Sequence, residues 1–243
     1  MQLLLIILIT LFGALVRSVF GFGEALVTMP LLALIGLPLP TATALIGAVG
    51  FLVALPATIR YRANIDWPTI LRLLAGSLIG ISFGIYLVKT VPTKLVLSAL
   101  GIFLIIYGSY SLYRSFHHEI KGAHLKNSGW DFIAGFVSGT LGSAYNSHGV
   151  PVAVYGTLKK WPAAKLRGIL QAHFLIVGLL VVISHITAGF WSLAAFKLLL
   201  YAAPGLIVTV ILGNYIVDHI APEKLIKYIY AMLILFGVLL LFR

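Results

Sequence analysis

The sequence is a succession of apolar runs separated by short connections, and this pattern leaves few folds open. The runs cover residues 2–16, 25–36, 41–58, 68–88, 93–113, 130–141, 150–158, 163–188, 192–217 and 222–242. Hydrophobic residues make up 61% of the 243 and charged residues 9%, whereas a soluble domain carries about 25% charged residues. At about 20 residues per transmembrane helix, the pattern predicts an all-α, multi-pass membrane protein without a separate soluble domain.

The charge balance is basic, with 17 Lys and Arg residues against six acidic residues. In a soluble protein this excess would suggest nucleic acid as a partner. Here the basic residues are scattered through short connections, so membrane topology and anionic lipid headgroups explain them, and no nucleic-acid binding is expected. The absence of cysteine excludes disulfides and thiol catalysis. Walker and HExxH motifs are also absent, so we predict no enzyme activity, cofactor or metal.

The least apolar stretch divides the chain into two halves. Residues 115–128 form a basic linker between a first transmembrane repeat over 1–114 and a second over 129–243, within one membrane domain. The linker carries His117, His118 and His124, whose spacing fits no particular metal-ligand set and is typical of a solvated loop.

The two halves share an ordered series of residues. At an offset of 129, four residues of the first half have counterparts in the second, namely Gly76, Gly84, Tyr86 and Val88 with Gly205, Gly213, Tyr215 and Val217. After one gap, the segment Pro92–Leu95 matches Pro222–Leu225. Chance similarity between apolar helices is the alternative, but the ordered matches favour an internal duplication.

Loop charges indicate how the halves are oriented. In the first half the connection 59–67 is basic and 37–40 is uncharged; in the second half 159–167 is basic and 186–191 has no Lys or Arg. Under the positive-inside rule, equivalent loops then lie on opposite sides, which predicts an inverted repeat with a cytoplasmic linker and both termini outside. Counting residues 1–36 as one crossing instead gives a parallel repeat, so eight or ten membrane segments both remain open.

Two polar stretches, 17–24 and 142–149, interrupt the apolar pattern at corresponding places. The run 2–16 is about 22 Å long as a helix, shorter than the hydrocarbon core of ~30 Å. Each half is therefore predicted to contain a broken or re-entrant hairpin of short helices plus three full transmembrane helices. Gly21 and Gly23 permit a tight hairpin tip. Two inverted tips would meet at a central site, with helix N-termini that favour anions.

The first tip contains the formal charges. A buried Arg17 is costly unless it is paired or solvated. It is predicted to bind an anionic substrate, with Ser18, Gly21 and Gly23 beside it, but it could also pair with Glu24 or extend to the membrane surface. Glu24 is a candidate for proton coupling, and its alternative role is as the partner of Arg17.

The second tip offers neutral groups. Tyr145, Asn146 and Ser147 are candidate substrate ligands, although Asn146 and Ser147 could equally cap the next helix. His148 is a candidate proton carrier, with internal hydrogen bonding as its alternative. Downstream, Gln171 is expected to face a cavity because an amide gains nothing from facing lipid. Its neighbour Arg167 has an alternative role as an anchor at the cytoplasmic end.

These residues carry a family resemblance across nearly the whole chain. RSVFGFGEALVTMPLLAL in the first half, with GFVSGTLGSAYNSHGVPVAVYGTLKKWP and LRGILQAHF in the second, resembles the signatures of the sulfite exporter TauE/SafE family. The matching positions are Gly21, Gly23, Pro30, Gly142 and Pro151. The chain departs from the pattern where Glu24 replaces a glycine and Tyr145-Asn146 replaces a second glycine run, which bears on the substrate more than on the fold.

The resemblance implies a multi-pass transporter of the bacterial inner membrane that exports sulfite, a sulfonate or a related small anion. Together with the broken segments, it predicts a secondary transporter that works by alternating access, with Glu24 and His148 as the candidates for proton coupling. The expected partners are the anion and membrane lipid. The rival hypotheses are an anion channel, a non-transporting membrane partner and a lipid-handling protein. The sequence leaves the oligomeric state, substrate and direction of flux open.

Overall fold

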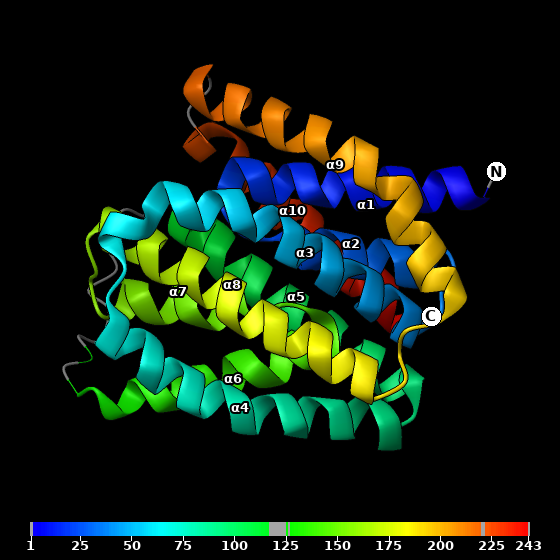
Figure 1. Cartoon of the computed structure of the whole chain (residues 1–243), viewed down its shortest axis with the longest axis horizontal. Helices are drawn as coiled ribbons and strands as arrows, with labels where there is room; N and C mark the ends of the chain where they lie inside the picture. The colour runs from blue at the N-terminus through cyan, green and yellow to red at the C-terminus, as the bar shows by residue number, and fades with distance from the viewer. Residues whose placement is uncertain (1, 117–124, 126, 220–221, 243) are drawn as a thin grey trace.

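The structure is a computed structural model that describes residues 2–116, 125, 127–219 and 222–242. Across these residues it contains ten α-helices, one short 3-10 helix and no strand, which confirms the predicted all-α architecture (Figure 1). The helices are α1 (Gln2–Phe20), α2 (Glu24–Leu34), α3 (Leu39–Tyr61), η1 (Arg62–Asn64), α4 (Trp67–Thr90), α5 (Thr93–Phe116), α6 (Gly129–Tyr145), α7 (Gly149–Leu158), α8 (Ala163–Thr187), α9 (Leu193–His219) and α10 (Pro222–Leu241).

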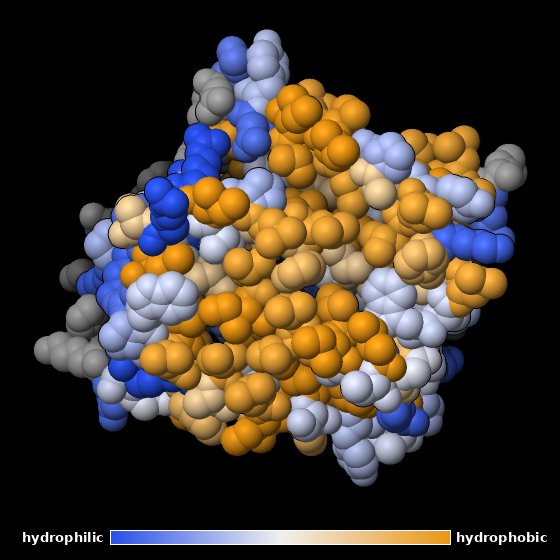
Figure 2. All heavy atoms as spheres, viewed as in Figure 1, coloured by the Kyte–Doolittle hydropathy of each residue, from blue (hydrophilic) through white to orange (hydrophobic). Residues whose placement is uncertain are grey.

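The molecular surface is that of a protein embedded in lipid. The helices α1, α3, α4, α5, α8 and α9 are long and apolar enough to cross a membrane. Figure 2 shows apolar side chains over the middle of one face, with hydrophilic residues gathered toward its ends. Leu71, Ile106 and Ile207 are 61%, 65% and 66% exposed, which would be unfavourable in water over so wide an area. The multi-pass membrane prediction is therefore confirmed.

Each half begins with a helix that breaks before a short second helix. The apolar run 2–16 is too short to span a bilayer, but α1 continues through Arg17 to Phe20 and is long enough to cross alone. It ends where Gly21 and Gly23 adopt φ angles of 78° and 96°, which glycine tolerates without a steric cost. In the second half, Asn146 at φ 57° ends α6 in the same left-handed region.

The turns after the two short helices also share their geometry. Gly36 follows α2 with φ 85°, and Lys160 follows α7 with φ 55°. Two residues later, Pro38 precedes α3 with φ −55° and ψ 134°, and Pro162 precedes α8 with φ −54° and ψ 144°. Both pairs are 124 residues apart. This common turn supports the internal duplication that the sequence predicts.

Helices of the two halves pack crosswise. α4 lies along α6 and α1 along α9, while α5 pairs with α10 and α3 with α8. A Cβ added to Gly76 or Gly80 of α4 would enter the backbone of α6, at Phe132 or Phe136. Small residues spaced four apart let helix backbones approach closely in lipid. The crosswise pairs therefore join the two halves into one body.

Both chain termini lie at one end of the helices in Figure 1. The α8–α9 connection lies at the same end, and the α3–α4 and α7–α8 connections lie at the opposite end. The latter two connections and the helix ends beside them carry Arg60, Arg62, Lys159, Lys160 and Lys165. The connections that the sequence assigns to the cytoplasm thus share one end of the molecule, which we call the basic end.

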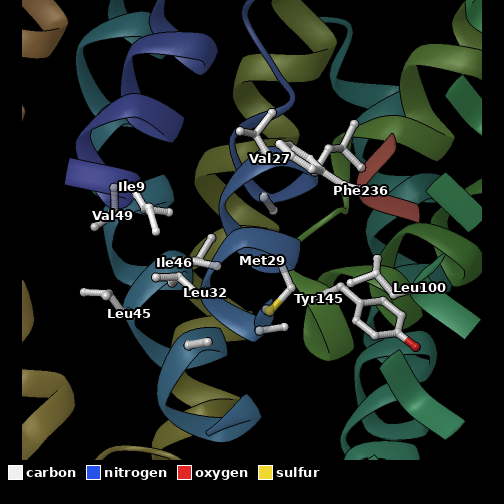
Figure 3. Packing of buried hydrophobic residues seen from close by; sticks show 14 of the residues in the cluster. Ile9, Val27, Met29, Leu32, Leu45, Ile46, Val49, Leu100, Tyr145 and Phe236 are labelled. Carbon is white, nitrogen blue, oxygen red and sulfur yellow. The ribbon is translucent and has the colours of Figure 1, made fainter. Parts of the chain in front are cut away.

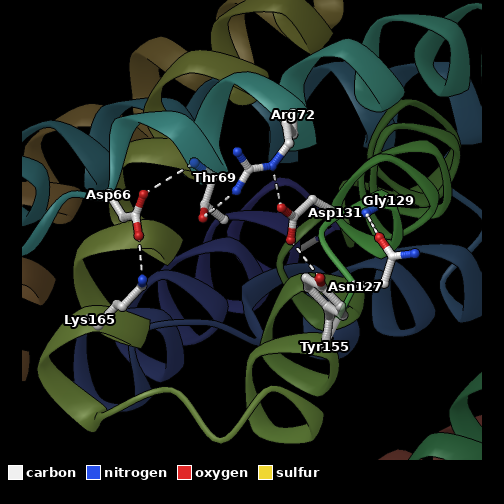
Figure 4. A network of polar contacts seen from close by, with 8 residues as sticks. All are labelled: Asp66, Thr69, Arg72, Asn127, Gly129, Asp131, Tyr155 and Lys165. Atoms are coloured by element: carbon white, nitrogen blue, oxygen red, sulfur yellow. Dashed lines mark hydrogen bonds and ion pairs between the residues drawn. The ribbon is translucent and has the colours of Figure 1, made fainter. Parts of the chain in front are cut away.

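A polar network joins helices at the basic end (Figure 4). The buried carboxylate of Asp131 accepts hydrogen bonds of 2.5 Å from Arg72 Nε and from the Tyr155 hydroxyl. Asp66, just before α4, pairs with Lys165 of α8. The hydrogen bond from the Lys165 ammonium holds the pKa of Asp66 below its usual value. These contacts tie α4 to α6, α7 and α8.

The short helix α2 is enclosed by protein rather than by lipid. Met29 and Leu32 are fully buried, and Figure 3 shows them among residues of neighbouring helices that include Ile46, Leu100 and Phe236. Non-helical backbone at membrane depth is stable only where protein or a wet cavity surrounds it. The packing around α2 meets this condition for the break at 21–23.

Little of the predicted linker 115–128 can be compared with the structure. α5 continues to Phe116 and α6 begins at Gly129. His117, His118 and His124 lie outside the described residues. The division into repeats at 1–114 and 129–243 stays a prediction.

Candidate functional site

Arg17 and Glu24 form an ion pair across the break between α1 and α2. Arg17 Nη1 lies 3.3 Å from Glu24 Oε2, and both residues are at most 5% exposed. The pairing that the sequence offered as an alternative is therefore present. Arg17 Nη2, however, has no hydrogen-bond partner among the described residues. Glu24 occupies one terminal nitrogen of the guanidinium, and the second terminal nitrogen is left for a ligand.

An aromatic ring and a glycine complete the surroundings of this pair. The Arg17 guanidinium carbon lies 4.2 Å from the centroid of the Phe174 ring, within cation–π range. On α3, a Cβ added to Gly50 would lie 3.1 Å from both Arg17 Nη1 and Glu24 Oε2. Gly50 thus gives the pair room that a side chain would take. Glu24 also opens the first turn of α2, where a carboxylate complements the helix dipole.

A cavity of about 140 Å³ extends from Arg17 toward the basic end. Four predicted substrate ligands line it together: Arg17, Ser18, Gly21 and Gln171. Its other polar lining residues are Arg60, Tyr61, Arg167 and Asn214. Arg17 is buried, whereas Arg60 and Arg167 are exposed. Positive charge is therefore present both at the inner end of the cavity and in its exposed part, an arrangement suited to drawing in a small anion.

Gln171 connects the cavity wall to the break after α1. Its Nε2 donates a 3.2 Å hydrogen bond to the carbonyl oxygen of Gly21, while Oε1 has no partner within the described ranges. The left-handed Gly21 exposes that carbonyl to Gln171 instead of to a helical amide. The side chain expected to face a cavity does so, and it also holds α8 against the hairpin tip.

The tip of the second hairpin meets the first on the other side of Arg17. Asn146 and Ser147 line a space of only about 10 Å³ with Arg17, Gly23 and Glu24. Asn146 Nδ2 donates a 2.7 Å hydrogen bond to the carbonyl of Thr43, which fixes the amide. The two predicted hairpin tips thus converge, but in this conformation their contact leaves no room for an anion.

Tyr145 and His148 lie away from the cavity. The Tyr145 hydroxyl donates a 2.7 Å hydrogen bond to the carbonyl of Val96, and its ring packs in the core (Figure 3). His148 is buried behind Phe174, with 5.0 Å between the ring centroids, and lies 6.2 Å from the ring of His173. The structure therefore gives Tyr145 a structural contact and places His148 against the Phe174 ring, which the Arg17 guanidinium also contacts.

Three cavity residues were not proposed as ligands from the sequence. Arg60 and Tyr61 end α3 and Asn214 lies near the end of α9, positions that topology alone explains. Asn214 reaches the cavity because α9 packs on α1, where a Cβ on Gly213 would overlap Ser18. A polar amide late in an apolar run is a sequence signal of the kind that identified Gln171.

Comparison with known proteins gives one match that covers nearly the whole chain. The sequence model of the family described as Sulfite exporter TauE/SafE matches residues 6–240. Both helix breaks and every residue of the cavity fall inside the matched range. No curated protein and no solved structure matches the chain.

Proposed function

The chain belongs to the sulfite exporter TauE/SafE family of membrane transporters, and on this premise we propose that it exports a small sulfur-containing anion by alternating access. Sulfite and small sulfonates are the proposed substrates, and a bacterial inner membrane is the proposed location. The observation that carries the proposal is the cavity that ends at Arg17, whose second terminal nitrogen is unpaired within the described residues.

The position of the cavity fits the loading step of an exporter. It opens toward the basic end, which the positive-inside rule assigns to the cytoplasm. On the far side of Arg17 the two hairpin tips leave a space of only about 10 Å³ between them, too small for an anion to pass. In this proposal the conformation is that of a transporter open to the cytoplasm, from which an exporter loads its anion.

The ion pair suggests how anion binding would couple to a proton. An anion that binds Arg17 competes with Glu24 for the same guanidinium, whose Nη1 lies 3.3 Å from the carboxylate. A buried carboxylate that loses its partner is costly as an ion and is favoured to take up a proton. In this proposal Glu24 gains the proton as the anion arrives, and His148 relays it beyond Phe174.

An inverted repeat is the architecture we propose for this cycle. It is supported by the common turn geometry at Gly36 and Lys160 and by the crosswise helix pairs. It is also supported by the position of the uncharged α8–α9 connection at the end opposite the basic α3–α4 connection (Figure 1). In such a fold the two hairpins exchange roles between the two open states.

Efflux from proteoliposomes loaded with sulfite or a small sulfonate tests the proposal. Wild type should give saturable efflux, and Arg17→Gln should bind the anion at least about 30-fold more weakly, since losing one partner of a buried charge pair costs about 2–5 kcal/mol. Arg62→Gln is the matched control, because Arg62 is exposed and near the cavity without lining it. Equal efflux by folded wild type and Arg17→Gln would exclude the role of Arg17. Efflux that never saturates would favour an anion channel.

A further inference from the structure

Beyond Arg17, the face of α3 that bears Gly50 continues toward the end opposite the basic end. Gly47, one turn earlier on α3, lets two polar side chains approach the helix closely: a Cβ there would lie 2.8 Å from Asn146 Oδ1 and 3.3 Å from His185 Nδ1. Gly50 faces the Arg17–Glu24 pair and Gly47 faces Asn146 and His185, so two glycines on one helix face open onto two consecutive polar groups. We call the second group, made of Gly47, Asn146, His148 and His185, the sealed seam.

The polar side chains of the sealed seam are buried with unused hydrogen-bonding atoms. Asn146 Oδ1, both ring nitrogens of His148 and Nδ1 of His185 have no partner within the described ranges. These side chains are at most 7% exposed. Unpartnered polar atoms in a protein interior lower stability and require an explanation. Their concentration in one place, continuous with the proposed anion site, points to a ligand that visits them.

An aromatic ring closes the seam at each end. Phe174 contacts both the Arg17 guanidinium and the His148 ring, which lie 4.2 Å and 5.0 Å from its own ring centroid. At the other end, Phe190 stacks on His185 with the centroids 5.5 Å apart and an angle of 28° between the rings. Phe190 itself packs with buried Ala44 and Ala195. Because its polar side chains are at most 7% exposed, the seam is closed to solvent in this conformation.

We propose that the sealed seam is a second anion seat, which holds the substrate after it leaves Arg17 and before it is released on the far side. This inference rests on the proposed transport function. The seat contains no formal charge: histidine N–H groups donate to the oxyanion, and Asn146 Oδ1 accepts an O–H from the anion or its water. Binding there is weaker than at Arg17, which favours release. Phe174 opens the seam to the cavity side and Phe190 opens it to the far side.

Single-cysteine labelling tests the seam, because the natural chain contains no cysteine. The variants are Ala57→Cys in the cavity, His185→Cys in the seam, and Val177→Cys, which is equally buried on α8 but packs against Ile81. A membrane-impermeant methanethiosulfonate that carries a sulfonate is applied to sealed vesicles of known orientation. Ala57→Cys should react from the basic side.

His185→Cys should react from the opposite side only, and faster when an anion gradient drives cycling. At rest its rate should be about 10- to 1000-fold below that of an exposed thiol, as expected for a minor open state. Labelling no faster than that of Val177→Cys, or labelling from the basic side, would overturn the proposal. The resting labelling rate of the thiol is measured without any substrate. A protein that does not transport sulfite can therefore still show access to the seam, and a protein that transports sulfite can still show none.

A second pair of variants keeps the proposal testable if His185→Cys does not fold. Gly47→Ala places a methyl group 2.8 Å from Asn146 Oδ1, inside the seam, whereas Gly101→Ala places one 2.8 Å from the Gly237 carbonyl, between α5 and α10. Gly47→Ala should lose turnover but keep the thermal stabilisation by sulfite that reports on the Arg17 site. Gly101→Ala should keep turnover per folded molecule. Equal turnover in the two variants would contradict a seat in the seam.

Discussion

The Arg17–Glu24 pair predicts a specific pattern of stability in three variants: Arg17→Gln, Glu24→Gln and the double substitution. Each single change leaves one charge buried without its partner. The double change removes both charges and leaves two amides that can hydrogen-bond to each other. Each single variant should therefore be much less stable than wild type, and the double variant should regain most of the loss.

The magnitude follows from the geometry. At 3.3 Å and an effective dielectric constant of about 20, the attraction between the two charges is about 5 kcal/mol. Desolvation of both ions opposes it, so replacing the whole pair is expected to be nearly neutral. Removal of one partner from a buried pair costs about 3–5 kcal/mol. The coupling energy in the double-mutant cycle, which is the sum of the two single losses minus the double loss, should accordingly be about 6 kcal/mol or more.

The assay is reversible unfolding in detergent micelles, with Arg62→Gln as a control for loss of one exposed arginine. An added anion supplies a second measurement. In Glu24→Gln the guanidinium is free for sulfite, which at 100 times its dissociation constant should restore about 2.7 kcal/mol. Wild type should gain less at the same concentration, because the anion must first displace Glu24.

Two results would refute this reasoning. The first is a loss in the double variant that equals the sum of the single losses within about 0.5 kcal/mol, which would mean that the two side chains do not interact. The second is an equal anion-induced stabilisation of wild type and Glu24→Gln, which would mean that Glu24 does not compete with the substrate.

Three further predictions concern the helix packing and the polar contacts around the site. Gly80→Val should destabilise the α4–α6 contact by about 1–3 kcal/mol through overpacking, whereas Ser82→Val on the exposed face of α4 should be tolerated in the same unfolding assay. Tyr155→Phe should cost about 1–3 kcal/mol because it removes a donor to a buried carboxylate; no loss would show that this hydrogen bond is dispensable. Asp66→Asn should cost at most about 1 kcal/mol at pH 7, since its partner Lys165 is partly exposed. Because the folded pKa of Asp66 is lowered, that difference should disappear as the pH falls through the folded pKa, and a difference that persists in acid would contradict the ion pair.

The sequence was most informative where a polar side chain falls inside an apolar run that is expected to lie in the membrane. Arg17 and Gln171 each interrupt an apolar run, and although they lie far apart in the chain they line the same cavity. The cost of burying an unpaired polar group makes such residues conspicuous, so their convergence could be anticipated without coordinates. The two breaks, at 21–23 and 146–148, were recognisable for the same reason.

The remaining site residues required the fold itself. Tyr145 has the same polarity signal as its neighbour Asn146, but the carbonyl of Val96 on α5 satisfies it. A sequence does not reveal whether a distant carbonyl is within reach. Arg60 stands at the end of α3, where the positive charge expected of a cytoplasmic loop explains it without a cavity. Asn214 lies five residues before the end of α9, and its polarity alone does not say which helix it faces. Only the packing of α9 on α1 brings Asn214 to the cavity.

The crosswise packing has a consequence for how the protein is synthesised and inserted into the membrane. Helix α1 leaves the ribosome well before its main partner α9, which follows after about 170 further residues, roughly 10–35 s later at ~5–20 residues per second. During that wait Arg17 and Glu24, both already synthesised, can satisfy each other within their own hairpin. The pair that positions the anion in the finished transporter would thus also let its first hairpin wait in the bilayer until the rest of the chain arrives.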